Sequence, residues 1–193
     1  MIRALKELKR QMDARADSDE VERDEEGRAI VEMTVLRDED FLSDFSAGKP
    51  VVSGEVAEFV EESAMAFRPK EPICLKIYSD CIDEEEEKVY SNALKEYYVR
   101  RYTENRRSMR RNRLAAAIML LIGVVALAVV LTLSLLKRVE ILVEVLDIFA
   151  WVFLWEAVDL FFLEGGVLRM KQLRFLRFID AKIEFLPRTR KEE

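Results

Sequence analysis

Two long apolar segments, residues 114–136 and 141–163, follow each other with four residues between them. Each contains 23 residues, whereas an α-helix needs about 20 to cross the ~30 Å hydrocarbon layer of a bilayer. The first segment carries no charge, and the second contains Glu144, Asp147, Glu156 and Asp159. The pattern therefore predicts two transmembrane helices that form a tight hairpin.

Outside these segments, three short stretches alternate apolar and polar residues, which is the pattern of a half-buried strand. They cover residues 31–35, 73–78 and 182–186. A turn at Glu26-Gly27 precedes the first stretch, and residues 21–23 are expected to pair back across it. The last stretch is expected to join the edge of the sheet that the earlier strands form, which makes the soluble domain discontinuous.

Helices complete the predicted cytosolic part. Ser53 is expected to cap a short helix whose apolar residues fall at helical spacing: Val56, Phe59, Val60, Ala64 and Phe67. Asp83 and Glu86 form a capping box, and no Gly or Pro follows before Gly123, so one helix is expected from residue 84 to residue 136. Gly165-Gly166 is expected to interrupt the helix that leaves the membrane, before a basic amphipathic helix over residues 167–178.

The predicted fold class is a membrane α-helical hairpin of two transmembrane helices, with a small cytosolic α+β domain on a long helical stalk. The expected segments are a polar, frayed or weakly helical start (1–19), the α+β domain (20–82), an Arg-rich helical stalk (83–113), the hairpin (114–163) and a basic helix and strand that return to the domain (164–193).

Charge is distributed unevenly along the chain. Residues 1–99 have a net charge of −12, residues 100–113 of +6, and the segment from residue 164 onward of +3. By the positive-inside rule, both termini are predicted to lie in the cytoplasm of a bacterial, multi-pass inner-membrane protein.

Anionic lipid headgroups are the expected partners of the basic residues next to the membrane, which are Arg106, Arg107, Arg110, Arg111, Arg113, Arg169 and Lys171. The acidic soluble part would repel nucleic acid.

The carboxylates of the second apolar segment are expected to lie on more than one face of the helix. On a helical wheel, one face holds Glu140, Glu144, Asp147, Trp151 and Trp155. Glu156 falls opposite Asp147, and Asp159 lies between them. A carboxylate that faces lipid near the helix centre costs about 2.5–3.5 kcal/mol, and one neighbouring helix cannot cover two opposite faces. The protein is therefore expected to form a homo-oligomer, unless the buried carboxyls are protonated.

Each of these polar residues also has a structural interpretation. Glu140 and Glu144 could pair with Lys137 and Arg138 at the outer surface, and the two tryptophans could simply pack. Glu156 and Asp159 could accept hydrogen bonds from Thr132, Ser134 or tryptophan N–H groups. The alternative is a cation path, in which Glu140, Glu144 and Asp147 of several subunits form rings of carboxylates.

The residues of an enzyme or a metal site are scarce. The chain has no histidine and two cysteines, Cys74 in a predicted strand and Cys81 in a predicted loop. Such a chain lacks the donors of the usual zinc sites and the bases of Cys–His catalysis. We therefore expect no catalytic residue, no cofactor site and no metal site, and we expect that the protein is not an enzyme.

The segment AWVFLWEAVDLFFLE, which begins at Ala150, resembles a group of uncharacterised bacterial two-span membrane proteins. In that group a cytosolic α/β segment precedes an Arg-rich helix and a membrane hairpin, and the second span ends in a Trp-Glu-x-x-acidic motif. Trp155, Glu156 and Asp159 correspond to that motif here. The resemblance implies the architecture and no particular activity.

These observations lead to two hypotheses about function. The first is a homo-oligomeric membrane scaffold or signalling component whose cytosolic domain binds a protein partner. The alternative is a cation-conducting oligomer that is lined by acidic residues of the second span.

Overall fold

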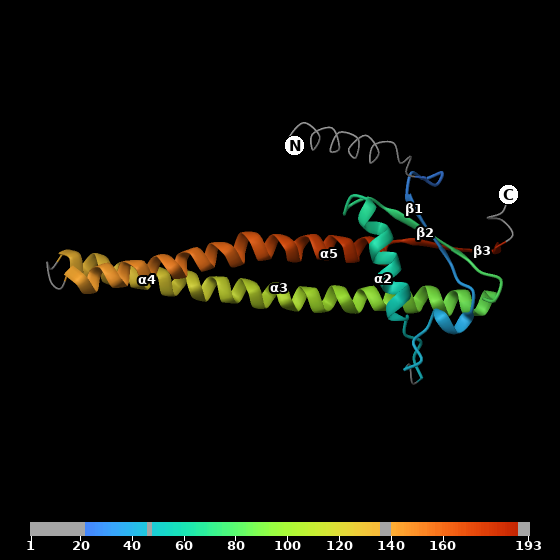
Figure 1. Ribbon diagram of the computed structural model, residues 1–193, viewed down its shortest axis with the longest axis horizontal. Coiled ribbons are helices and arrows are strands. Elements are labelled where there is room, and N and C mark those ends of the chain that lie inside the picture. The colour runs from blue at the N-terminus through green and yellow to red at the C-terminus, as the bar shows by residue number, and fades with distance from the viewer. Residues whose placement is uncertain (1–21, 46–47, 136–139, 189–193) are drawn as a thin grey trace, which may run out of the picture. The chain divides into compact units, whose positions relative to one another are not determined.

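The computed structural model describes residues 22–45, 48–135 and 140–188 (Figure 1). The chain divides into two compact units. Residues 1–94 and 180–193 form the sheet unit, and residues 95–179 form the helical unit. The sheet unit is thus built from segments that flank the helical unit in sequence. The more detailed boundaries of the stalk and the hairpin stay a prediction.

A three-stranded sheet lies at the centre of the sheet unit. Its strands are β1 (Ala29–Thr34), β2 (Ile73–Tyr78) and β3 (Lys182–Leu186), in the order β1-β2-β3 (Figure 1). The register aligns Ala29 with Ile73 and Cys74 with Lys182. All three predicted strands are confirmed, and the last one adds to the edge as expected.

The predicted α+β class is wrong in one respect, because both strand pairs are parallel. Parallel neighbours need a crossover connection, and this arrangement is typical of α/β folds. The helix α2 (Gly54–Ser63) lies in the connection from β1 to β2. The connection from β2 to β3 contains the whole helical unit. Alternation identifies a strand but not its direction, so the sequence pattern could not distinguish the two classes.

The predicted cap of α2 is confirmed, and its predicted apolar face is partly wrong. The Ser53 hydroxyl accepts a hydrogen bond from the Val56 N–H at 3.3 Å. Val56 and Val60 are buried as expected, whereas Phe59 is 47% exposed. The helix ends at Ser63 and passes into a short 3₁₀ turn, η2 (Ala64–Ala66). Helical spacing places Phe59 on the outer flank, away from the stripe that contacts the sheet.

The helix α3 (Glu84–Leu135) begins at the predicted capping box and contains 52 residues. The Asp83 carboxylate accepts hydrogen bonds from the N–H groups of Glu85 and Glu86, and the Glu86 carboxylate accepts from the Asp83 N–H at 3.0 Å. At 1.5 Å per residue the helix is roughly 78 Å long. The expected single helix is therefore confirmed up to the last described residue.

Aromatic side chains fix the start of α3 in the sheet unit. Tyr90 stacks on Phe41 with ring centroids 4.8 Å apart, and its hydroxyl donates a hydrogen bond to Asp38. Asp38 belongs to the 3₁₀ turn η1 (Asp38–Asp40). Burial raises the pKa of Asp38, and the nearby carboxylates of Glu86, Asp83 and Glu39 raise it further.

The predicted turn before β1 is also confirmed. The Gly27 N–H donates to the Asp24 carbonyl at 2.9 Å, and Gly27 has a φ of 77°, which suits glycine. Arg23 forms an antiparallel bridge with Ala29 across this turn. Residue 21 of the expected hairpin partner lies outside the described residues.

The second helical stretch of the helical unit is continuous from residue 140 to residue 179. It comprises α4 (Glu140–Val158), the π-helical segment η3 (Asp159–Glu164) and α5 (Gly165–Ile179). The predicted interruption at Gly165-Gly166 is wrong, because Gly165 is helical with φ −59° and ψ −35°. The irregularity instead lies just before the glycines, in the π-helical turn.

Among the described helices, α3 is the one that is long and apolar enough to cross a membrane. Only 17% of its most apolar window is buried, whereas the core helix of a soluble protein would be mostly buried. The helix α4 does not meet the same criterion, so two spans are not shown. Its longest run without charge extends only from residue 148 to residue 155.

Candidate functional site: the interhelical seam

One face of α3 follows a heptad spacing through the helical unit. Residues 102, 109, 116, 123 and 130 recur every seven positions and are buried or half-buried, and residues 98, 105 and 112 form a second row beside them. This spacing is the signature of a helix that packs lengthwise against another helix. We call this face, together with the residues that it contacts, the interhelical seam.

The partner in the seam is the α4–η3–α5 stretch, which runs antiparallel to α3 (Figure 1). Tyr98 stacks on Phe178 at 4.4 Å between ring centroids. Further along α3, Asn105 contacts Leu168. Gly123 then lies against Leu154. Residue numbers rise along α3 as they fall along its partner, so the two helical stretches form a hairpin in space.

Side-chain hydrogen bonds cross the seam between the described helices. The Asn105 amide donates to the Leu168 carbonyl at 2.9 Å, and the Asn112 amide donates to the Leu160 carbonyl at 2.7 Å. The Gln172 amide donates to the Tyr102 hydroxyl at 2.9 Å. Asn105 is only 7% exposed. Polar groups inside such a seam favour one register, because a slipped register would leave them without partners.

These polar residues were not anticipated from the sequence. Asn105 and Asn112 lie within the Arg-rich run, where the basic residues dominate the pattern. Their heptad spacing, in phase with Met109 and Ala116, was the signal that could have revealed them. The seven predicted anchoring residues lie between the seam residues in sequence, and all seven side chains are exposed.

The π-helical segment keeps the partner stretch facing α3. Before it, the buried residues Ala150 and Ala157 are seven positions apart. After it, Gly165 continues the same row eight positions beyond Ala157. A π-turn inserts one extra residue, and this insertion explains the shift. The Leu160 carbonyl in this turn accepts from both the Gly165 N–H and the Asn112 side chain.

Gly123 marks the closest approach of the two helices. A Cβ atom at this position would lie 2.8 Å from Cγ of Leu154 and 3.2 Å from the Leu154 backbone nitrogen. Real side chains do not approach so closely, so a larger residue would force the helices apart. A glycine at a helix crossing is typical of close packing in membranes.

The acidic residues of α4 and η3 are not gathered at one place. Glu144 and Glu156 are exposed, whereas Asp147 and Asp159 are half-buried at the edge of the seam. Among the described residues, none of these four carboxylates forms an ion pair. Glu140 begins α4, and its proposed partners Lys137 and Arg138 lie outside the described residues.

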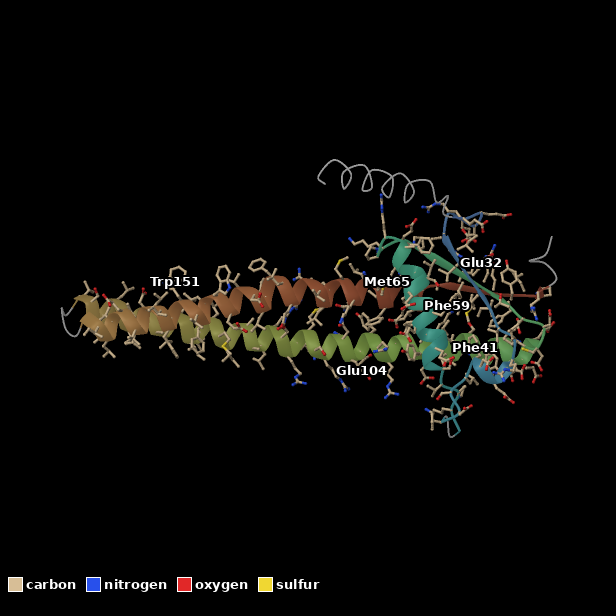
Figure 2. The ribbon with its side chains drawn as sticks, viewed as in Figure 1. Glu32, Phe41, Phe59, Met65, Glu104 and Trp151 are labelled. Carbon is tan, nitrogen blue, oxygen red and sulfur yellow. The ribbon has the colours of Figure 1, made fainter. Side chains whose placement is uncertain are left out.

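The expected interhelical hydrogen bonds to Thr132 and Ser134 are not formed in the described helices. The Thr132 hydroxyl donates to the Ala128 carbonyl of its own helix at 2.8 Å. The register explains this, because Leu160 lies beside Asn112, so the neighbouring Glu156 and Asp159 lie far along α3 from Thr132. Trp151 and Trp155 are 61% and 72% exposed, and Trp151 points away from α3 (Figure 2).

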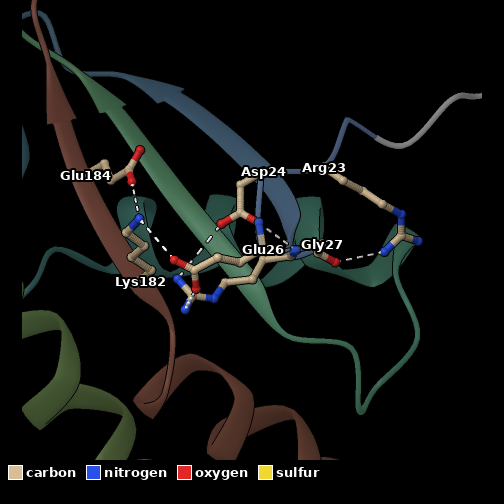
Figure 3. A network of polar contacts seen from close by, with 7 residues as sticks. Arg23, Asp24, Glu26, Gly27, Lys182 and Glu184 are labelled. Carbon is tan, nitrogen blue, oxygen red and sulfur yellow. Dashed lines mark hydrogen bonds and ion pairs between the residues drawn. The ribbon is translucent and has the colours of Figure 1, made fainter.

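The sheet unit carries a polar network at the edge of its outer face (Figure 3). Lys182 pairs with Glu184 at 2.8 Å, which raises the pKa of Lys182. Burial alone would raise the pKa of Asp24, but hydrogen bonds from the N–H groups of Arg28 and Glu26 lower it below 3.8. These contacts close the turn before β1 and border a depression of about 590 Å³.

The cysteines lie as predicted. Cys74 is fully buried in β2, and burial raises the pKa of its thiol, so it is a poor nucleophile. Cys81 is exposed after β2. Within the described part of the chain, no three His, Cys, Asp or Glu side chains gather as metal ligands.

A second surface feature of the sheet unit is a groove of about 410 Å³ between the end of β1 and α2, which both apolar and charged side chains line. It is lined in part by Leu36, Val56 and Phe59. Leu36 and Phe59 are 64% and 47% exposed, and the nearby Met65 is 59% exposed (Figure 2). Apolar side chains gathered in this way mark a surface suited to protein contacts.

Residues 94–148 match a family model described as VirB8 protein. The match covers less than a third of the chain and includes the basic run, the apolar part of α3 and the first half of α4. It ends before Trp155, so it does not support the resemblance that rests on the Trp-Glu-x-x-Asp motif. It also gives no support to a cation-conducting oligomer. No curated protein and no solved structure matches the chain.

Proposed function

We propose that this protein is a membrane-anchored, homo-oligomeric component of a bacterial secretion assembly, and that it acts by binding other proteins rather than by catalysis. The observation that carries the proposal is the VirB8 match, because it covers the basic run and the apolar stretch of α3 together. VirB8 family members are anchored in the inner membrane and assemble with other secretion-system proteins.

We further propose that both helical stretches lie in the membrane, with both termini in the cytoplasm. In support, α4 packs along the apolar part of α3, as the contact between Gly123 and Leu154 shows. If α3 crosses the bilayer, α4 lies at the same depth. Both helices also expose large apolar side chains, such as Leu121 at 64% and Val152 at 60%, which water would not favour.

The oligomer is supported by the position of Glu156. This carboxylate is exposed on the helix pair, between the exposed Trp155 and the buried Ala157. In lipid an uncovered carboxylate costs about 2.5–3.5 kcal/mol near the helix centre. A neighbouring subunit that covers this face would remove the cost. In the sheet unit, the groove beside α2 is the surface that we propose for a protein partner.

Cysteine labelling in cells tests the membrane topology. In a background that lacks Cys74 and Cys81, Val139→Cys should react with a membrane-impermeant reagent from outside. Ser108→Cys and Lys171→Cys should be protected until the cells are opened. Labelling of Lys171→Cys from outside would show a single span and overturn the hairpin topology, while leaving α3 as the anchor.

Partner binding is tested by cross-linking in the bacterial host. Phe59→Asp places a charge in the groove, and Val99→Asp introduces the same charge at an exposed residue of α3 outside it. We expect the first variant to lose its cross-links to other proteins and the second to keep them. Identical cross-links in both variants would exclude this groove as the docking surface.

A further inference from the structure

The helical unit contains an apolar groove of about 340 Å³ beside the seam. Ala117 and Leu120 of α3 form one wall. Ala157 of α4 and the consecutive phenylalanines of η3, Phe161 and Phe162, form the other. All of these side chains are apolar, so the interior of the groove offers no hydrogen-bonding partner to a polar ligand.

The groove forms because small side chains lie next to large ones on the two helical stretches. Ala116 and Ala157 are almost fully buried and let the helices approach closely. Leu120, Phe161 and Phe162 are 51%, 53% and 66% exposed, and they rise on either side. The result is a slot whose walls are large apolar side chains and whose floor is alanine, which suits a flexible hydrocarbon chain.

A cation lines one end of this slot. Arg113 contributes to its lining and is exposed. Among the described residues, Arg113 has no ion pair with a carboxylate of the chain. It is the last basic residue of a run with a net charge of +6, and the uncharged apolar segment of α3 begins directly after it. An arginine at this position is thus available to a negatively charged group at the membrane surface.

We propose that this groove binds one phospholipid with a net negative headgroup, with an acyl chain between Leu120 and Phe162 and the headgroup phosphate on Arg113. Charge complementarity selects this occupant, because an apolar slot with a guanidinium at its end matches an anionic lipid in both of its parts. The proposal rests on membrane insertion of α3 together with the α4–η3 stretch that forms the second wall of the groove, and it does not require the secretion role.

The test is native mass spectrometry of the full-length protein in mild detergent, titrated with phosphatidylglycerol or with phosphatidylcholine of the same acyl chains. We expect the wild type to bind one phosphatidylglycerol at least tenfold more tightly than phosphatidylcholine. Ala117→Leu fills the groove and should weaken phosphatidylglycerol binding about tenfold. Ala128→Leu makes the same change at an exposed position of α3 outside the groove and should have no effect.

The headgroup contact has its own matched pair of variants. Arg113→Gln should remove most of the preference for phosphatidylglycerol, while Arg107→Gln, an exposed arginine outside the groove, should keep it. Equal binding of the two lipids by the wild type would overturn the proposal. So would equal losses in Ala117→Leu and Ala128→Leu, because these would show a general lipid annulus. The cross-linking result for the sheet unit is independent of each of these outcomes, so the lipid site and the partner-binding role can fail separately.

Discussion

The two units of this protein differ in the size of the side chains that they bury. In the sheet unit the fully buried residues include large side chains, such as Phe41, Ile73 and Leu75. Between residues 110 and 164 of the helical unit the buried residues are smaller, such as Ala116, Val130 and Ala150. A unit in water gains stability from burial of apolar area. Helices in lipid gain no stability from burial of apolar side chains, because these side chains are already surrounded by lipid. Small residues instead let the helix backbones approach closely. The difference agrees with the proposal that the helical unit lies in lipid and the sheet unit in water.

The outward-facing residues differ in the same sense. The sheet unit turns Lys182, Glu184 and Glu26 outward in a charged network. The helical unit instead exposes Leu121, Trp155 and Phe162, at 64%, 72% and 66%. The hydrogen bonds between its two helical stretches lie inside, where Asn105 and Asn112 cross the seam. The helical unit thus has the polarity expected of a membrane-embedded pair.

The largest expected effect comes from a leucine-to-alanine substitution that is made once in each of the two units. Leu75→Ala removes a side chain that is 1% exposed in the sheet core, and we expect a loss of about 2–5 kcal/mol. Leu121→Ala removes one that is 64% exposed, and we expect a change within about 0.5 kcal/mol. Urea titration in detergent, followed by labelling of the buried Cys74 in a Cys81→Ser background, measures unfolding of the sheet unit. Similar midpoints for both variants would contradict the contrast.

A glycine pair tests the close packing of the helical unit. Gly123→Ala adds a methyl group against Leu154, and we expect a cost of about 1–3 kcal/mol from overpacking. Gly166→Ala adds the same group where nothing lies within 4 Å and should be neutral or slightly stabilising. Unfolding by sodium dodecyl sulfate, followed by tryptophan fluorescence, measures this unit. If Gly123→Ala were as stable as Gly166→Ala, the close approach would be wrong.

The seam asparagines should contribute less. Asn112→Leu removes the hydrogen bond to Leu160, and we expect a loss of about 0.6–1.7 kcal/mol, which spans the mean and the maximum for interhelical hydrogen bonds in membranes. Asn92→Leu changes an exposed asparagine of the sheet unit and should not affect the helical unit. The same detergent unfolding assay measures both. A register shift in Asn112→Leu, read from disulfide trapping between cysteines at positions 109 and 164, would confirm that this residue fixes the pairing.

The smallest effect concerns the pH dependence of the sheet unit. Because the pKa of Asp38 is raised above 3.8, the folded state binds its proton more tightly than the unfolded state. This group therefore favours folding below pH 3.8 and loses that contribution as pH rises through the folded-state pKa. Asp38→Asn should raise stability at pH 7 by about 0.5 kcal/mol, because it removes both the cost of partly burying the charge and a solvent-screened repulsion. Urea midpoints at several pH values measure this, and a destabilised variant at pH 7 would oppose it.

The sequence predicted those parts of the fold whose signals are local. The caps at Ser53 and Asp83, the three strands and the length of α3 each depend on a few neighbouring residues, and all were confirmed. Strand direction is not local, so the parallel sheet was missed. Phe59 was placed on the apolar face of α2, because helical spacing alone does not show where a contact stripe ends.

The seam was predicted only in outline. Two adjacent apolar segments indicated a hairpin, but the charged pattern of α4 drew attention to its carboxylates rather than to Ala150 and Ala157. The π-helical turn shifts the contact row by one residue, and a constant helical period cannot represent such a shift. The roles of Asn105 and Asn112 depend on the register between two helices, which no single segment encodes.

The central claim, that both helical stretches lie in lipid, is tested most directly by the two tryptophans of the chain, Trp151 and Trp155, which both belong to α4 and are exposed. The full-length protein is reconstituted into liposomes with and without brominated acyl chains, and its fluorescence is also measured with aqueous iodide. We predict strong quenching by the brominated lipids and little by iodide. Strong quenching by iodide with none by brominated lipids would place α4 in water and contradict the account.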